Sequence, residues 1–475
     1  MTVHSEALGS AAFRRRYGTR LSYVAGSMYR GISSPDLVAR MATAGLLAFL
    51  GAGGLSVEEL DRAVAETRNR LDGREGGFGV NLLASPSRPS DEKDVVELCL
   101  SRGIDIVEAS AFVTITPPMV RYRLDGLTVG PHGEIVAPRR LIAKVSRPEV
   151  ARLFLEPPPE PIVRQLLDAR RITVEEASLA RRMPMADSIT VEADSGGHTD
   201  QRPALTLLPD IIRLRDQMQE GVPQEQRVSI GAAGGLGTPA SVAAVLLMGA
   251  DYVLTGSVNQ CTVEAGTSDL VKDMLQEMET TDTSIAPAGD MFQEGAKVQV
   301  LGKGTLFAPR GRRLYELYQR YSSWEDLVRG DPRAARQIQE KWLGRSFEQV
   351  WQETRARYAI RRPEEIERAE RQPHLKMEMV FRRYFSQSSR WAQEGEKSQR
   401  VNFQIQCGPA LGAWNRFVRG TSLESWRSRH VDEVAEILMR GAAEQLEAAL
   451  GHYLPRSPAS TASTFSVDNY PGRQS

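Results

Sequence analysis

The chain has 475 residues, a quarter of them charged, and a formal net charge of zero, so it can bury one large core plus a second unit. Its three cysteines, Cys99, Cys261 and Cys407, are widely spaced and form no CxxC pair, which argues against a disulfide framework and against a metal site. The N-terminus lacks the apolar core of a signal peptide, and no apolar run reaches the length of a membrane helix. We therefore expect a cytoplasmic protein with no membrane contact and no bound metal.

Apolar strands alternate with helical patterns through the first 258 residues. Strands are expected at 21–25, 46–50, 78–82, 104–108, 141–145, 188–192, 228–230 and 252–255, with helices at 33–43, 56–71, 91–102 and 239–248. A Pro- and Gly-rich insertion occupies 117–138. This alternation indicates a parallel sheet covered by helices, and eight strands favour a closed α/β TIM (β/α)₈ barrel over an open sheet.

The stretch from 228 to 258 reads VSIGAAGGLGTPASVAAVLLMGADYVLTGSV and is the richest in glycine at its turns. Glycine lets a phosphate approach the main chain, and the loops after strands 7 and 8 of such barrels commonly hold one. The first turn would run through four glycines, Gly231, Gly234, Gly235 and Gly237. The second turn would follow the last strand at Gly256 and Ser257. An ordinary strand–helix–strand unit with tight turns is the alternative.

A second feature is the segment VEADSGGHTDQRP, which places His198 after a predicted strand. Barrel enzymes build their active sites at this end of the strands, and an imidazole there can donate or accept a proton. A turn histidine bonded to a carbonyl is the alternative. Glu192, Asp194 and Asp200 lie nearby in sequence and could orient the ring, but their spacing is not that of metal ligands.

Residues 303–400 change character, because apolar residues recur at helical spacing and no strand pattern appears. This segment holds 22 Lys/Arg and 14 Asp/Glu, a net of +8, so the rest of the chain carries −8. A solvated helical face accounts for such charge, and docking of an acidic partner is the alternative; no uninterrupted basic run suggests nucleic acid. We divide the chain into an N-terminal extension (1–20), the barrel (21–302), the helical region (303–400), helices that pack back on the barrel (401–454) and a disordered tail (455–475).

Several motifs together resemble one family. SGGH, AAGGLGTPASVAAVLLMGADYVLTGS, FGVNL and AKV look like strand ends of the flavin barrel of nitronate monooxygenases and FMN-type enoyl-ACP reductases. MYRGISSPDLVARMATAGLLAFLGAGGL, VEASAFVTITPPMVRYRLDGL, GAKVQVLGKGTLFAPRGRRLYELYQRYSSWEDL and CGPALGAWNRFVRG are similar to the trans-acting enoyl reductases of polyketide and polyunsaturated fatty acid synthases. The resemblance runs from about residue 21 to about residue 446.

This resemblance implies bound FMN, NADPH as the hydride source, and a 2-enoyl thioester carried on an acyl carrier protein as substrate. It implies that His198 donates the proton or binds the thioester carbonyl, with solvent as the alternative donor. The residues implied to bind the cofactor are Asn81, Lys144, Gly197, Ala233, Gly234, Gly235, Thr255, Gly256 and Ser257. For Asn81 a turn cap, and for Lys144 a structural ion pair, are the alternatives.

Substrate or partner contacts are expected from Ser110 and Phe112 at the rim and from Arg312, Arg313, Arg382 and Arg383 in the helical region. Two rival functions remain open: a nitronate monooxygenase-like flavin oxidase of small molecules, and a recruitment scaffold without catalysis. The sequence also leaves a homodimer open.

Overall fold

The computed structural model describes residues 3–73, 77–84, 89–359 and 362–453. Its internal contacts divide the chain into two compact units. The first, called the barrel unit below, comprises Met1–Ser195, Thr199–Gly266 and Ala410–Ser475, and the second, the helical unit, comprises Gly196–His198 and Thr267–Pro409. Each unit is described by itself. The expected disordered tail lies outside the described residues.

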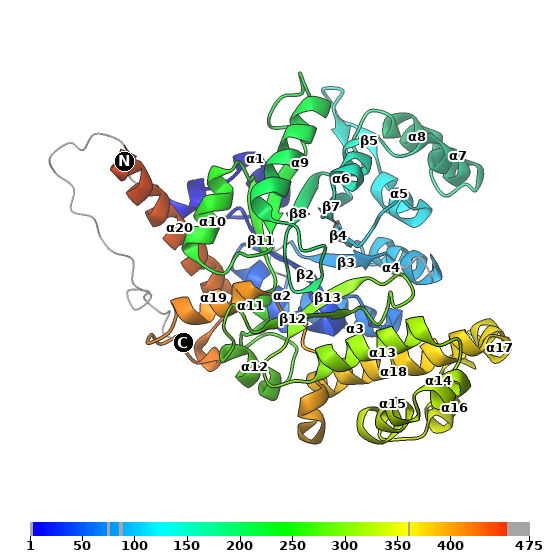
Figure 1. Cartoon of the computed structure of the whole chain (residues 1–475). Helices are drawn as coiled ribbons and strands as arrows, with labels where there is room; N and C mark the ends of the chain where they lie inside the picture. Colours follow the sequence, from blue (N-terminus) through cyan, green and yellow to red (C-terminus); the bar gives the residue numbers. More distant parts are fainter. Residues whose placement is uncertain (1–2, 74–76, 85–88, 360–361, 454–475) are drawn as a thin grey trace. The chain divides into compact units, whose positions relative to one another are not determined.

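The barrel unit is built on eight parallel strands that close on themselves (Figure 1). Their order around the barrel is β1-β11-β10-β8-β7-β4-β3-β2. The predicted barrel is thus confirmed, and each predicted strand overlaps an observed one. The strands are β1 (Tyr23–Ala25), β2 (Leu47–Leu50), β3 (Gly79–Leu83), β4 (Ile106–Ser110), β7 (Arg140–Val145), β8 (Ser188–Glu192), β10 (Ser229–Ala233) and β11 (Tyr252–Thr255).

Helices connect and cover these strands. Several of these helices are preceded by a residue that caps the helix N-terminus. Ser56 and Glu59 form a capping box at the start of α3, and Ser34 caps α2, which has proline in its first turn. In the C-terminal part of the unit, α20 lies beside α10 (Figure 1). The helices are α1 (Ala11–Tyr17), α2 (Pro35–Thr43), α3 (Val57–Leu71), α4 (Pro89–Ser101), α5 (Pro117–Leu124), α6 (Pro148–Leu155), α7 (Glu160–Asp168), α8 (Val174–Ala180), α9 (Ala204–Met218), α10 (Pro239–Leu247), α11 (Ser257–Gln260), α19 (Pro409–Phe417) and α20 (Val431–Tyr453). The Pro- and Gly-rich insertion contains α5 and a hairpin of β5 (Thr128–Val129) and β6 (Ile135–Val136).

The N-terminal extension contributes to the barrel core. The ring of Phe13, from α1, stacks on that of Tyr252 with centroids 4.2 Å apart, and the Tyr17 hydroxyl is 2.9 Å from the hydroxyl of Ser188. The rings of Phe13 and Tyr17 belong to a buried cluster with residues from strands β1, β2, β4, β7, β10 and β11. Because Ser188 and Tyr252 begin their strands, α1 closes the N-terminal end of the barrel.

Gly231 has a different role from the one expected. It lies inside β10 rather than in a turn, and a Cβ added there would come within 2.3 Å of the Tyr252 ring. The absence of a side chain therefore makes room for a large aromatic residue inside the barrel. Gly237 is also a packing glycine, because an added Cβ would lie 1.9 Å from the carbonyl oxygen of Ala410.

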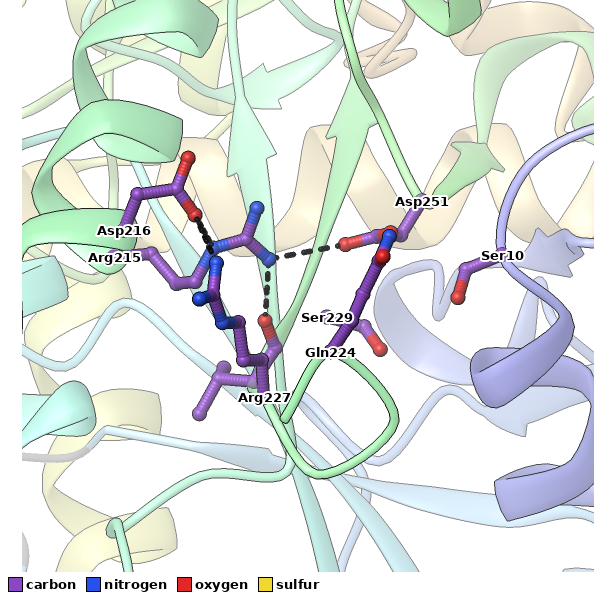
Figure 2. Close-up of a pocket in the computed structure, with 8 residues that line it drawn as sticks. Ser10, Arg215, Asp216, Gln224, Arg227, Ser229 and Asp251 are labelled. Atoms are coloured by element: carbon purple, nitrogen blue, oxygen red, sulfur yellow. Dashed lines mark hydrogen bonds and ion pairs between the residues drawn. The ribbon is translucent and has the colours of Figure 1, made fainter. Parts of the chain in front are cut away.

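A polar pocket of about 220 Å³ lies at the N-terminal ends of β10 and β11 (Figure 2). Arg215 spans it, with Nη1 3.3 Å from a carboxylate oxygen of Asp251 and Nε 2.6 Å from one of Asp216. The cations of the pocket are paired within the unit, and the pocket lies at the opposite end of the strands from the glycine turns. This end of a barrel generally serves stability rather than catalysis.

The helical unit holds a three-stranded sheet that the sequence did not predict. Its strands are β12 (Thr283–Pro287), β13 (Lys297–Leu301) and the two-residue β9 (Gly197–His198), in the order β12-β13-β9. The residues that precede helix α13 (Phe307–Arg320) thus belong with the helices, so the main segment of the unit begins at Thr267 instead of at the expected boundary near 303. It ends at Pro409, the last residue of the Cys407-Gly408-Pro409 motif.

Between residues 303 and 400 the described residues form helices and no strand, as predicted. The long helix α18 packs along α13 (Figure 1). Aromatic and aliphatic residues from both helices belong to a single core. The helices of this unit are α12 (Asp269–Gln276), α13 (Phe307–Arg320), α14 (Trp324–Gly330), α15 (Pro332–Gln337), a π-helical segment (Ile338–Leu343), α16 (Phe347–Ala359), α17 (Pro363–Arg371) and α18 (Pro373–Glu394), followed by a 3₁₀ segment (Lys397–Asn402).

Candidate active site

Two predicted glycine turns lie at neighbouring strand ends of the barrel unit. Strands β10 and β11 pair directly, with Ala233 opposite Leu254, so the turns that follow them are adjacent. Gly234 and Gly235 both have positive φ, +88° and +73°, a conformation that favours glycine. At Gly235 and Gly256 an added Cβ would meet no atom within 4 Å. The main chain therefore borders open space at the two predicted positions.

The residues beside these glycines are less accessible. Ala233 is 4% exposed and belongs to the barrel core. Thr255 is also buried, and its hydroxyl is bonded to the Tyr23 hydroxyl at 2.5 Å and accepts a bond from the Asn259 amide at 3.0 Å. Ser257 is the first residue of the short helix α11. The open main chain at Gly235 and Gly256, rather than these side chains, fits a phosphate group.

A buried polar network occupies the C-terminal ends of β3 and β4. The amide nitrogen of Asn81 donates to the main-chain oxygen of Glu108 at 3.0 Å and to the hydroxyl of Ser110 at 2.9 Å. The Glu108 carboxylate accepts bonds from the amide and the hydroxyl of Ser27 through one oxygen, Oε2. Its other oxygen is buried and has no hydrogen-bond partner among the described residues.

Glu108 was not predicted as a site residue. The available signal was a carboxylate between two apolar strand residues, Val107 and Ala109, and Glu108 is completely buried. Burial raises the pKa of this carboxyl, and the neighbouring Lys144 lowers it only in part. Buried acidic groups of this kind cluster at functional sites.

Lys144, on β7, forms an ion pair with Glu192, on β8, with Nζ 3.3 Å from Oε1. Burial alone would lower the pKa of Lys144, but the charges of Glu192 and Glu108 outweigh it and raise the pKa. The lysine is therefore cationic and lies between two carboxylates from neighbouring strands. The contacts of Lys144 agree with the alternative interpretation, a structural ion pair. Glu192 and Glu108 would partly neutralise any positive charge that Lys144 presents to a cofactor.

Of the five described non-glycine residues with positive φ, three lie in loops that follow barrel strands, and Asp72 and Arg170 follow helices. Ala111, between Ser110 and Phe112, has φ +62°, and Arg30 and Gln201 have φ +53° and +54°. Such conformations cost about 1–3 kcal/mol for a non-glycine residue and often occur at functional sites. Ser110 and Phe112 are themselves buried, so they shape this rim from beneath rather than from an exposed surface.

His198 belongs to the helical unit, where it is the second residue of β9 and pairs with Val298 of β13. Gly197 precedes it with φ +80°. The imidazole Nε2 is 3.1 Å from a carboxylate oxygen of Asp290. Of the acids near His198 in sequence, Asp200 is bonded to Arg147 and Glu192 to Lys144. The observed partner is 92 residues away in the chain and was not predicted.

The four arginines expected to contact a partner make contacts within the helical unit. Arg312 donates to the Ile285 carbonyl oxygen at 2.7 Å, and Arg313 pairs with Asp331 at 3.0 Å. Arg382 bonds to the main chain of the loop that carries Asp290. Arg383 is half-buried, and the burial of its guanidinium lowers its pKa.

Cys99, Cys261 and Cys407 are buried thiols, and none of them forms a disulfide within the described residues. Among the described residues, no cluster of three or more His, Cys, Asp or Glu side chains is placed to hold a metal ion. None of the described helices has the length and apolar character needed to cross a membrane.

Comparison with protein families gives two matches. The nitronate monooxygenase model matches residues 20–303, and the inserted helical domain of [acyl-carrier-protein] S-malonyltransferase matches residues 321–403. The chain therefore belongs to the nitronate monooxygenase family.

Among the relatives of this chain are proteins of polyketide and macrolactin biosynthesis. The enoyl reductase domain of MlnA, from the macrolactin cluster of Bacillus amyloliquefaciens, aligns with 94% of this chain and 99% of its own at 39% identity, with a TM-score of 0.89. Polyketide biosynthesis protein PksE of Bacillus subtilis is 46% identical over 93% of this chain and 57% of its own length. Polyketide biosynthesis protein ThaF of Burkholderia thailandensis is 46% identical over 93% of this chain and 37% of its own length. The resemblance to enoyl reductases of these synthases is confirmed, and the chain spans about half the length of PksE and less of ThaF.

Proposed function

We propose that this protein is an FMN-dependent enoyl reductase that acts in trans on 2-enoyl thioesters carried by an acyl carrier protein, with NADPH as hydride source. The observation that carries this proposal is the open main chain at Gly235 and Gly256, on adjacent turns at the C-terminal end of the barrel. Backbone amides of such turns bind phosphate. The similarity to the MlnA enoyl reductase domain supports the reaction type.

The barrel residues supply the remaining cofactor contacts. Because the amide nitrogen of Asn81 is bonded to Glu108 and Ser110, its carbonyl oxygen is the atom available to accept a bond from the pyrimidine N–H of the flavin. Lys144 would present a positive charge, reduced by Glu192 and Glu108, to the same ring. When bound, FMN would pass a hydride from NADPH to the β-carbon of the substrate.

His198 is the proposed donor to the thioester. A hydrogen bond from its imidazole to the thioester oxygen would polarise the double bond and stabilise the enolate, and the same group could protonate the α-carbon. Solvent is the alternative source of that proton. Replacement of His198 distinguishes the two sources of the proton. The enoyl step slows in the variant only if His198 is the direct donor.

The helical unit is the proposed contact for the carrier protein, which is expected to be acidic. Its match to the inserted helical domain of a malonyltransferase that acts on acyl carrier protein supports this assignment. Arg313 and Arg382 form ion pairs within the unit, whereas Arg312 is exposed and stays a candidate. Further candidates are two exposed cations on α15, Arg333 and Arg336. Neither Arg333 nor Arg336 forms an ion pair with another described residue.

Charge-guided docking is tested by salt. Attraction between exposed charges weakens as the Debye length falls from about 10 Å at 0.1 M salt to about 3 Å at 1 M. Activity on a carrier-bound enoyl substrate should fall steeply with salt, and the Arg333→Glu/Arg336→Glu protein should show a raised KM for that substrate alone. Equal salt dependence with a small soluble thioester would refute docking by charge.

The reaction itself is tested by spectroscopy of the purified protein. A flavin spectrum that NADPH bleaches and that a crotonyl thioester restores, without restoration by a nitronate under anaerobic conditions, supports the reductase. Turnover of a nitronate with O₂ would favour the oxidase of small molecules. A protein without flavin, which also fails to bind added FMN, would leave only the scaffold.

A further inference from the structure

His198 is held in place by main-chain contacts on both sides of it. Its strand pairs with β13 within the helical unit, so its Cα position follows that of Val298. At Gly196 an added Cβ would lie 2.6 Å from the main-chain carbon of Cys407, which means that this segment packs directly against another stretch of backbone. The position of the imidazole is thus determined by the helical unit, although the residue follows a barrel strand in sequence.

Asp290 lies in the loop between β12 and β13 and holds the ring of His198. The ring nitrogen and the carboxylate oxygen are 3.1 Å apart, and both side chains are about one third exposed. Burial alone would raise the pKa of Asp290, but the charge of His198 and the hydrogen bond from its ring outweigh this effect and bring the pKa to about 2. The carboxylate is therefore ionised over the physiological range and favours a protonated imidazole.

Arg382 fixes the loop that carries Asp290. Its Nε donates to the Gly289 carbonyl oxygen at 2.8 Å, and its Nη2 lies 3.4 Å from the Asp290 carbonyl oxygen. At Gly289 an added Cβ would come within 2.5 Å of the Cβ of Phe385, so the loop packs closely on α18.

Behind Arg382, Glu378 lies one turn earlier on α18 and is completely buried. One of its oxygens is 3.2 Å from Nη1 of Arg382, and the other accepts a bond from the side chain of Gln293. A buried carboxylate with two partners holds a cation in one orientation. Two charged groups of α18 therefore lie close to the His198–Asp290 pair: Arg382, whose charge lowers the pKa of Asp290, and Glu378 behind it.

We propose that Asp290 is the positioning residue for His198, and that Arg382, anchored by Glu378, keeps Asp290 in place. A carboxylate bonded to one ring nitrogen fixes the orientation of an imidazole and stabilises its cationic form. The helical unit thereby contributes to the reaction as well as to docking, and Arg382 serves the active site instead of contacting the carrier protein. This inference rests on the proposed role of His198 as donor.

The test is the protonation midpoint of His198, followed by NMR of ¹³C-labelled histidine in the protein without substrate. The chain has six histidines, and His198→Ala identifies the relevant signal. Loss of an adjacent opposite charge shifts a midpoint by about one pH unit or more, so Asp290→Asn should weaken the affinity of His198 for its proton about tenfold. Arg382→Ala should alter the midpoint through the displaced loop, and Arg382→Lys should restore it in part.

Arg390→Ala is the matched control, because Arg390 forms an i,i+4 ion pair with Glu394 on the same helix and is exposed. It should leave the midpoint unchanged. In turnover, Arg382→Ala should lower kcat with an unchanged KM for the carrier-bound substrate, whereas a docking residue would raise KM alone. An unchanged His198 midpoint in Asp290→Asn would overturn the inference. If Asp290→Asn shifts the His198 midpoint but the unaltered protein has no enoyl reductase activity, the proposed function is refuted. The pairing of Asp290 with His198 then still stands.

Discussion

Replacement of Gly235 by Asp is expected to abolish flavin binding without unfolding the protein. An added Cβ at this position meets nothing within 4 Å, so the fold itself offers no steric objection to a side chain. The residue has φ +73°, and a left-handed conformation costs an L-residue about 1–2 kcal/mol, least for Asn and Asp. The expected loss of stability is therefore small.

The effect on a phosphate is larger. Two unit charges of the same sign at roughly 5 Å repel by about 3 kcal/mol at an effective dielectric constant of about 20. That repulsion corresponds to about a 200-fold weaker Kd for each unit of phosphate charge, before the volume of the carboxylate is considered. Gly235→Ala should show only the steric part and retain more flavin than Gly235→Asp.

The assay measures the flavin content of purified protein by absorbance and the Kd of the apoprotein for FMN by fluorescence. Gly221→Asp is the matched control, because Gly221 has φ +80° and equally open surroundings in a loop after α9. It should suffer the same strain and keep its flavin. A Gly235→Asp protein that purifies with a full flavin complement would refute the phosphate assignment.

Three further results are expected. His198→Ala should retain flavin and slow the enoyl half-reaction about 10²–10³-fold, with reduction by NADPH little affected; equal slowing of both half-reactions would indicate a role in binding or folding. Because burial raises the pKa of Glu108 above its usual 4.5, the folded protein binds a proton that the unfolded chain releases. The free energy of unfolding should therefore fall as pH rises above about 4.5, and Glu108→Gln should flatten that slope in urea titrations, whereas an unchanged slope would assign it to other groups. In the polar pocket, Asp251→Ala removes one of the two carboxylates paired with Arg215 and the acceptor of the Ile230 amide, and should lower the free energy of unfolding by about 1–3 kcal/mol, with flavin content unchanged; a loss of flavin would show that this end of the barrel also supports the cofactor.

The sequence by itself determined the barrel and the positions of its glycine turns. Strand and helix periodicity, capping residues and turn glycines are local properties, so eight strands and the pair Gly234 and Gly235 could be located without knowledge of distant contacts. Local patterns also located the helices between 303 and 400. The same reasoning misplaced Gly231, because its need for a small residue comes from Tyr252 on the neighbouring strand.

Only the tertiary structure decided which charges meet. The buried carboxylate of Glu108, the ion pair of Lys144 and the partner of His198 all depend on side chains that are brought together from separate strands or loops. Asp290 was missed because the sheet that carries His198 joins a two-residue strand to a hairpin about 100 residues later, and so short a strand has no detectable period. Arg382 was expected to contact a partner but is bonded within the helical unit. A helical pattern shows on which face of a helix a residue lies, but it does not show which carbonyl oxygens or carboxylate will lie against that residue.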